Sequence, residues 1–218
     1  MTQDDASSVT GSATRPAPRV VCVFCGARKG RDPQWEALAR ALGQGLALRG
    51  YTLLYGGGHV GLMGALADGA LDAGGQVIGV IPSSLMRREV GHTGLTELEV
   101  VDDMHLRKKR MILRSDAFIT LPGGLGTLDE LFEVLTLGQL GEHDRPMLLL
   151  DPTDYYAGLL QFLGRVVDQG LASAPDVSAL QVCRSVDAAL DALDDRIPFS
   201  IKTTLETPHE RKSERTAG

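Results

Sequence analysis

Short apolar runs alternate with longer amphipathic segments along most of the chain. The apolar runs predict strands over residues 20–24, 51–55, 76–81, 97–101, 117–121, 147–150 and 180–183. Helical patterns fill the intervals, over residues 33–49, 61–73, 104–115, 128–140, 154–169 and 186–193. Because strands that alternate with helices pair in parallel, the pattern predicts an α/β fold. We expect a doubly wound parallel sheet of about six to seven strands with helices on both faces.

Three segments depart from this pattern. Residues 83–96 are irregular and long enough to suggest a binding loop. Residues 1–18 and 199–218 are polar and lack periodicity, which predicts disordered tails at both ends. We therefore expect one folded domain over residues 19–198.

The composition argues against several classes of protein. The net charge of −6 disfavours a nucleic-acid binder that works by broad neutralisation of phosphates. No apolar run approaches the roughly 18 residues needed to span a bilayer, and residues 1–18 lack the basic start and apolar stretch of a secretory signal. The expectation is a cytoplasmic protein with no nucleic-acid or membrane partner.

Cys22 and Cys25 form a Cys-x-x-Cys pair, which in other settings is redox-active or binds metal. Here both fall in a predicted strand, where an offset of three places the side chains on opposite faces. We therefore interpret them as buried strand residues. No zinc-type spacing occurs elsewhere, so we expect no metal site.

Residues 121–130, Leu-Pro-Gly-Gly-Leu-Gly-Thr-Leu-Asp-Glu, form the most informative segment. They join a strand to a helix, so the glycines allow close approach of a ligand and the helix start presents free N–H groups and partial positive charge. These features predict a phosphate or carboxylate site with one acid, Glu130, beside it. Taken alone, Thr127 and Glu130 also fit a capping box, in which the glutamate only satisfies a backbone N–H. The two roles can coexist.

A second glycine-rich turn, residues 56–61, matches Gly-x-Gly-x-x-Gly between a strand and a helix. The dinucleotide fingerprint also requires an acid at the end of the following strand, where it holds a ribose diol. That strand ends in Ile81-Pro82-Ser83, without an acid. A tight turn, or part of a mononucleotide site, is therefore favoured over an NAD site.

Residues 104–110 form a basic run at a helix start, Met-His-Leu-Arg-Lys-Lys-Arg. Cations there oppose the helix dipole, so their placement needs a reason. Lys109 and Arg110 suit a solvated face. Arg107 and Lys108 fall in the first turns, near the sheet edge that carries the glycine turn, where an arginine can bind a phosphate or carboxylate through two bonds.

Taken together, these segments resemble the LONELY GUY family, the cytokinin-activating phosphoribohydrolases often mislabelled as lysine decarboxylases. The resemblance covers roughly residues 19–170. It is carried by residues 55–58 with 61–64, by Met-His-x-Arg-Lys at 104–108, and by Pro-Gly-Gly-x-Gly-Thr-x-x-Glu at 122–130, with support from 116–119 and 139–141.

The resemblance implies a Rossmann-like fold and hydrolysis of an N6-substituted adenosine 5′-monophosphate to the free base and ribose 5-phosphate, without a cofactor. It implies that Arg107 and Glu130 are the essential catalytic pair. It also implies a homodimer, or in some members a hexamer, with each site completed across the interface. The substrate-binding residues that we expect are Gly57, Gly58, Glu89, Lys108, Gly124, Leu125, Gly126, Thr127, Leu128, Asp129 and Thr136.

Two positions depart from the family pattern. The first glycine turn commonly reads Gly-Ser-Ser, but here it reads Gly26-Ala27-Arg28, so a hydroxyl contact is missing and an arginine is present. The family's Thr-Trp is Thr136-Leu137. That second change alters the expected pocket for the N6 substituent.

The residues themselves fit an N-glycosidase, because a fixed carboxylate can stabilise the oxocarbenium-like state that forms as a ribosyl–purine bond breaks. A non-catalytic nucleotide or cofactor carrier on the same scaffold is the alternative. A dinucleotide oxidoreductase is the third hypothesis.

Overall fold

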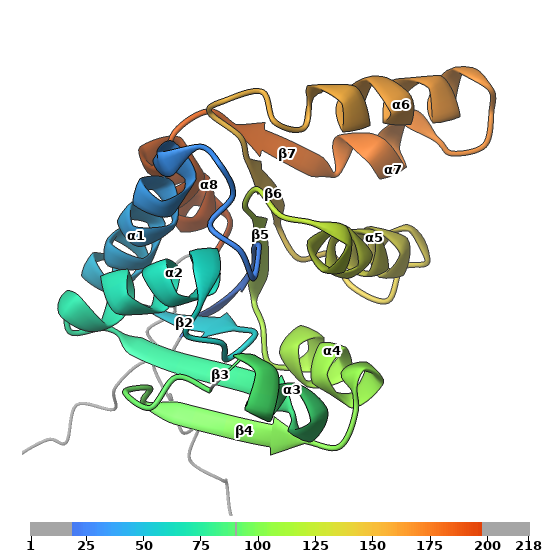
Figure 1. Ribbon diagram of the computed structural model, residues 1–218. Helices are drawn as coiled ribbons and strands as arrows, with labels where there is room; N and C mark the ends of the chain where they lie inside the picture. The colour runs from blue at the N-terminus through green and yellow to red at the C-terminus, as the bar shows by residue number, and fades with distance from the viewer. Residues whose placement is uncertain (1–18, 90, 198–218) are drawn as a thin grey trace, which may run out of the picture. The chain divides into compact units, whose positions relative to one another are not determined.

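The computed structural model describes residues 19–89 and 91–197, and within these ranges the chain forms one sheet of seven parallel strands (Figure 1). The strands are β1 (Arg19–Phe24), β2 (Tyr51–Tyr55), β3 (Gln76–Pro82), β4 (Glu97–Val101), β5 (Ala117–Thr120), β6 (Met147–Leu150) and β7 (Leu180–Cys183). The helices are α1 (Pro33–Leu48), α2 (Gly61–Asp72), α3 (Ser83–Glu89), α4 (Met104–Leu113), α5 (Leu125–Gln139), α6 (Ala157–Asp168), α7 (Ala174–Ser178) and α8 (Val186–Arg196). The predicted parallel α/β sheet is confirmed.

The strand order is β4-β3-β2-β1-β5-β6-β7, so the chain builds outward from β1 in one direction and then from β5 in the other. β1 and β5 are neighbours, with Val21 paired to Ala117. In an open parallel sheet, the crevice at the carboxyl ends of the two strands where the order reverses is the usual ligand site. Here that crevice lies between the loops that follow β1 and β5.

Helices cover both faces of the sheet and bury two apolar clusters (Figure 1). One cluster joins one set of strand side chains to α1, α2 and α8; the other joins the opposite set to α4, α5 and α6. Cys25 belongs to the first and Cys22 to the second, and both thiols are free and buried. The interpretation of this pair as buried residues on opposite faces is confirmed.

Three local predictions were wrong. Residues 83–89, expected as loop, form α3, and α7 was not predicted at all although Ser173 and Asp176 give it a complete capping box. α5 begins at Leu125, three residues before the predicted start. The first helical turn of α5 is formed by residues that the sequence pattern assigned to the preceding glycine-rich loop. Glycine is tolerated there because the N–H groups of a first helical turn need no partner within the helix.

The predicted tails, residues 1–18 and 199–218, lie outside the described residues. Among the residues that the structure describes, none of the helices combines the length and apolar character required to cross a membrane.

Candidate active site

The turn after β5 opens directly into α5 with no side-chain cap among the described residues. Gly124 is the N-cap, with φ −100° and ψ −153°. The N–H groups of Leu125, Gly126 and Thr127 therefore have no partner within the helix. The capping-box hypothesis is wrong, because Thr127 is the third helical residue rather than the N-cap and Glu130 lies a turn further on. The side chain of Glu130 is free for another role.

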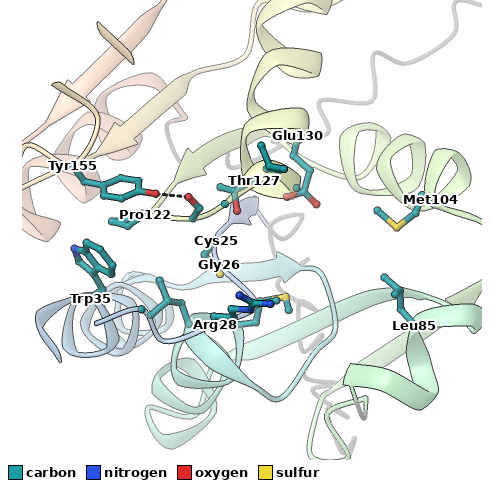
Figure 2. Close-up of a pocket in the computed structure, with 18 of the residues that line it drawn as sticks. Cys25, Gly26, Arg28, Trp35, Leu85, Met104, Pro122, Thr127, Glu130 and Tyr155 are labelled. Carbon is teal, nitrogen blue, oxygen red and sulfur yellow. Dashed lines mark hydrogen bonds between the residues drawn. The ribbon is translucent and has the colours of Figure 1, made fainter. Parts of the chain in front are cut away.

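The residues that carry these N–H groups line a cavity of about 620 Å³ at the crevice between β1 and β5 (Figure 2). The loop after β1 forms one wall, and its Gly26 N–H donates to the carbonyl of Pro122 on the other wall at 3.1 Å. Figure 2 shows Trp35 and Tyr155 at one end of the cavity and Leu85 and Met104 at the other. The site predicted from the glycine turn is thus an open cavity at the reversal point of the sheet.

Arg107 and Glu130 meet at the wall of this cavity. Their side chains come from α4 and α5 and approach to 3.9 Å between Arg107 Nη2 and Glu130 Oε1, although both residues are largely buried. Arg107 also donates from Nε to the carbonyl of Val80 at 3.1 Å and from Nη2 to that of Gly56 at 3.2 Å. The guanidinium is therefore held by main-chain acceptors of two strand ends, and it lies beside the carboxylate of Glu130.

Burial raises the pKa of Glu130 to about 7, and the charge of Arg107 opposes that rise. Desolvation disfavours the ionised carboxylate, whereas a nearby cation favours it. A carboxyl group whose pKa lies near neutrality can accept a proton at physiological pH and release it again, which is what a general base requires.

The other glycine turn supports this pair through its close packing against the protein's own atoms. A Cβ atom at Gly56 would overlap Nη2 of Arg107, and a Cβ atom at Gly61, where φ is +66°, would overlap the backbone of Ala27. Gly57 and Gly58 pack beneath β3 and residue 91 and do not line the cavity. Its glycines are thus explained by close packing, which accords with the absence of the dinucleotide acid.

This chain is similar in sequence to known proteins over most of its length. The family model described as "Possible lysine decarboxylase" matches residues 63–193. The chain is 46% identical over 189 residues to a cytokinin riboside 5'-monophosphate phosphoribohydrolase of Rhodococcoides fascians, covering 86% of this chain and 95% of that one. It is 48% identical over 153 residues to the phosphoribohydrolase LOG4 of Arabidopsis thaliana, covering 70% and 71% of the two chains.

The chain belongs to the LONELY GUY family. Among solved structures, the molybdenum cofactor carrier protein of Chlamydomonas reinhardtii is similar at a TM-score of 0.64 and 22% identity, over 82% of this chain and 98% of that one. At that identity the similarity is one of fold.

The LONELY GUY motif residues divide into two groups in this structure. Arg107, Glu130, Gly124, Leu125, Gly126 and Thr127 line the cavity. Leu128, Asp129, Lys108, Thr136, Gly57 and Gly58 do not. Glu89 is the last residue of α3, and its side chain lies outside the described part of the chain.

Lys108 is occupied by neighbouring acids. Its Nζ lies 2.9 Å from a carboxylate oxygen of Asp129 and 3.0 Å from one of Glu133, and its side chain is 12% exposed. These bonds join α4 to α5 directly beside the Arg107–Glu130 pair. In this chain, Lys108 joins α4 to α5 through Asp129 and Glu133.

Arg28, Trp35 and Tyr155 are among the cavity residues that were not predicted as site residues in this LONELY GUY chain. The rings of Trp35 and Tyr155 meet edge to face at 5.1 Å. Arg28 carried a signal, because it replaces a hydroxyl residue of the family pattern. The aromatic pair carried none, since residues 120 positions apart in sequence become neighbours only when β1 and β6 flank β5.

Proposed function

We propose that this chain hydrolyses the N-glycosidic bond of an N6-substituted adenosine 5′-monophosphate, releasing the purine base, a cytokinin, and ribose 5-phosphate. The names of its relatives support this reaction. The observation that carries the proposal is that Glu130, with its raised pKa, lines the same cavity as the unpaired N–H groups of α5.

The 5′-phosphate binds at the start of α5. Main-chain N–H groups of Leu125, Gly126 and Thr127 and the positive end of the helix dipole favour a dianionic group there. Arg28 lines the same cavity and adds a cation. Phosphate binding far from the reacting bond orients the ribose, and this orientation lowers the barrier at the anomeric carbon.

Glu130 acts on the anomeric carbon and the attacking water. As the C1′–N9 bond breaks, its electron pair leaves with the purine and positive charge develops on the ribose. The Glu130 carboxylate stabilises that charge and takes a proton from the water, whose oxygen bonds to C1′. The departing purine takes up one proton from solvent and Glu130 releases to solvent the one that it took from water, so the products are the neutral base and ribose 5-phosphate and the carboxylate is restored. Arg107 keeps the Glu130 carboxylate in place and balances its charge.

A product assay tests this function. Purified protein is offered AMP, its isopentenyl derivative, the unphosphorylated riboside and other purine monophosphates, and released base is quantified by chromatography. We expect the base to be released from the adenosine monophosphates, and at a much higher rate than from the unphosphorylated riboside. Glu130→Gln should lower kcat by at least about 1,000-fold.

The matched control is Glu133→Gln, on the same helix but outside the cavity, which should retain activity. Full activity in Glu130→Gln would reject the assigned role of this residue. Tight AMP binding without release of base from any monophosphate would favour the alternative, a non-catalytic carrier. The relatives at 42–48% identity make that alternative the weaker one.

We further infer that the protein is a homodimer, which the outer surface of α5 supports. Leu125 and Leu140 are 87% and 68% exposed, and Phe132 is also exposed. With 3.6 residues per turn, these side chains and Thr136 lie within about 80° of one another around the helix. Thr136 would then lie at the interface, where the family resemblance expects a substrate contact across subunits. Phe132→Asp should give monomers with reduced activity, measured by sedimentation and the product assay; dimers in that variant would reject this interface.

The same proposal includes a cytoplasmic location and no nucleic-acid partner. The net charge of −6 supports the second point.

A further inference from the structure

Three consecutive carbonyls in the turn before α5 each accept a hydrogen bond. The carbonyl of Leu121 accepts from the hydroxyl of Tyr156 at 2.7 Å, that of Pro122 from the N–H of Gly26 at 3.1 Å, and that of Gly123 from the hydroxyl of Tyr155 at 2.6 Å. The orientation of every peptide plane from Leu121 to Gly124 is therefore fixed by a donor outside the turn.

The fixed carbonyls also fix the N–H groups that follow them. In a planar trans peptide, the C=O and the next N–H point in opposite directions. With the Gly123 carbonyl bound to Tyr155, the N–H of Gly124 is directed away from that ring, and the backbone enters α5 at a set angle. Pro122 has no N–H, so the peptide plane held by Tyr156 directs none. The direction in which the chain and its N–H groups enter α5 thus depends on the bond from Tyr155 to the Gly123 carbonyl.

The tyrosines are themselves held by Asp151 at the end of β6. Its fully buried carboxylate accepts from the N–H of Tyr155 at 2.8 Å and from the N–H of Tyr156 at 3.0 Å. Arg184 donates to the carbonyl of Asp151 at 2.7 Å and to the carboxylate of Asp154 at 2.5 Å. Asp154 has a positive φ of +57°. A chain of bonds therefore runs from β7 through this loop to the turn after β5.

The two hydroxyls occupy different environments. Tyr156 is buried, and burial raises the pKa of its hydroxyl, so it remains a donor at all physiological pH values. Tyr155 is 43% exposed and lines the cavity (Figure 2). Its bond to Gly123 can be removed with little effect on the core, whereas loss of the Tyr156 hydroxyl would leave a buried carbonyl without a donor.

We propose that Tyr155 is a positioning residue for phosphate recognition. Its hydroxyl aligns the main-chain N–H groups at the start of α5 with the 5′-phosphate, and it makes no contact with the reacting bond. This inference rests on the proposed function, since it names the residue that tunes selectivity for the phosphorylated substrate at the same site.

The test compares affinities for AMP and adenosine by titration calorimetry, in a Glu130→Gln background so that no turnover occurs. Tyr155→Phe removes only the hydroxyl. We expect it to weaken AMP binding about threefold to tenfold, the equivalent of one ordinary hydrogen bond, and to leave adenosine binding unchanged. In the enzyme with Glu130 intact, the same substitution should raise KM for the monophosphate and leave kcat within about twofold.

The matched control is Tyr51→Phe. The Tyr51 hydroxyl donates to Asp194 at 2.6 Å at the amino end of β2, remote from the cavity, so its loss should leave both affinities unchanged. Unchanged AMP affinity in Tyr155→Phe, or equal weakening for AMP and adenosine, would overturn the proposal. If the protein binds AMP but hydrolyses no monophosphate, the proposed function fails and the same two affinities still decide the role of Tyr155. If the parent protein does not bind AMP, both proposals fail.

Discussion

The two glycine turns of this protein are similar in sequence and opposite in use. Both follow a strand of the parallel sheet and both open into a helix. The turn after β2 is filled by the protein itself, because the Arg107 guanidinium lies against Gly56 and the loop after β1 lies against Gly61. At the turn after β5, a Cβ atom at Gly124 or Gly126 would meet nothing within 4 Å. Glycine in the first turn admits a side chain, and Gly124 and Gly126 in the second leave open space where we propose that the substrate phosphate binds.

The two turns differ because the strands that they follow occupy different positions in the sheet. β2 lies between β1 and β3, where helices and loops of the same half cover its carboxyl end. β5 adjoins β1 at the point where the strand order reverses, and there the two connecting loops diverge. A glycine motif at a strand end therefore predicts close approach of some group, and the strand order decides whether that group is a side chain or a substrate.

Among the glycine substitutions, Gly56→Ala should have the largest effect on activity. The added methyl group displaces the Arg107 guanidinium, which then loses its bonds to the main chain and its place beside Glu130. We expect kcat/KM to fall at least about 100-fold, as for loss of a charge-stabilising group. Steady-state kinetics measure this, and a circular dichroism spectrum like that of the parent shows that the fold persists. Wild-type kinetics in this variant would refute the role of the first turn.

Gly61→Ala should damage stability more than chemistry. The position has a φ of +66°, and its new methyl group meets the backbone of Ala27, which cannot rotate away. We expect a loss of about 2–4 kcal/mol in the free energy of unfolding, measured by urea denaturation. Gly74→Ala also sits at positive φ but has no neighbour within 4 Å, so it should cost only about 1 kcal/mol. Equal losses in the two variants would contradict the packing explanation.

Glu130 lies in the helix that follows the second glycine turn, so the pH dependence of activity tests its role. Its pKa is raised to about 7 by burial, and the ionised form is the active one, so kcat/KM should rise with pH and level off above about 7. One pH unit below that pKa, the rate should be about tenfold lower. The substrate phosphate also ionises, near pH 6. The residual kcat/KM of Glu130→Gln should therefore change with pH only near 6, where the substrate phosphate ionises. A pH profile identical in shape to that of the parent would exclude Glu130 as the titrating group.

Gly124→Ala should have the smallest effect and completes the comparison with Gly56→Ala. Its φ of −100° suits any residue, and a methyl group there enters open space. We expect kcat within about twofold of the parent and a small rise in KM, since the methyl group narrows the phosphate site without blocking it. A loss as large as that of Gly56→Ala would mean that the turns do not differ in the way described.

Local pattern determined much of this fold. The inner strands were predicted within a residue or so because a strand buried on both faces is a short apolar run. The prediction of α3 as loop was wrong, because a short helix beside the sheet edge has too few residues to display a period. The start of α5 was misplaced because Gly124, its N-cap, has no side chain that could mark the first residue of a helix.

By itself, the sequence determined the parallel α/β class, the family, and the residue types of the site. Only the tertiary structure decided which of those residues meet. Arg107 reaches Glu130 because α4 and α5 lie on the same face of the sheet, and Lys108 pairs with Asp129 and Glu133 instead of lining the cavity. Tyr155, in the loop after β6, reaches Gly123 in the turn after the neighbouring strand β5. The physical reason is that strand and helix formation depend on neighbours in sequence, whereas strand order, which brings distant residues together, depends on how all the apolar faces can be buried at once.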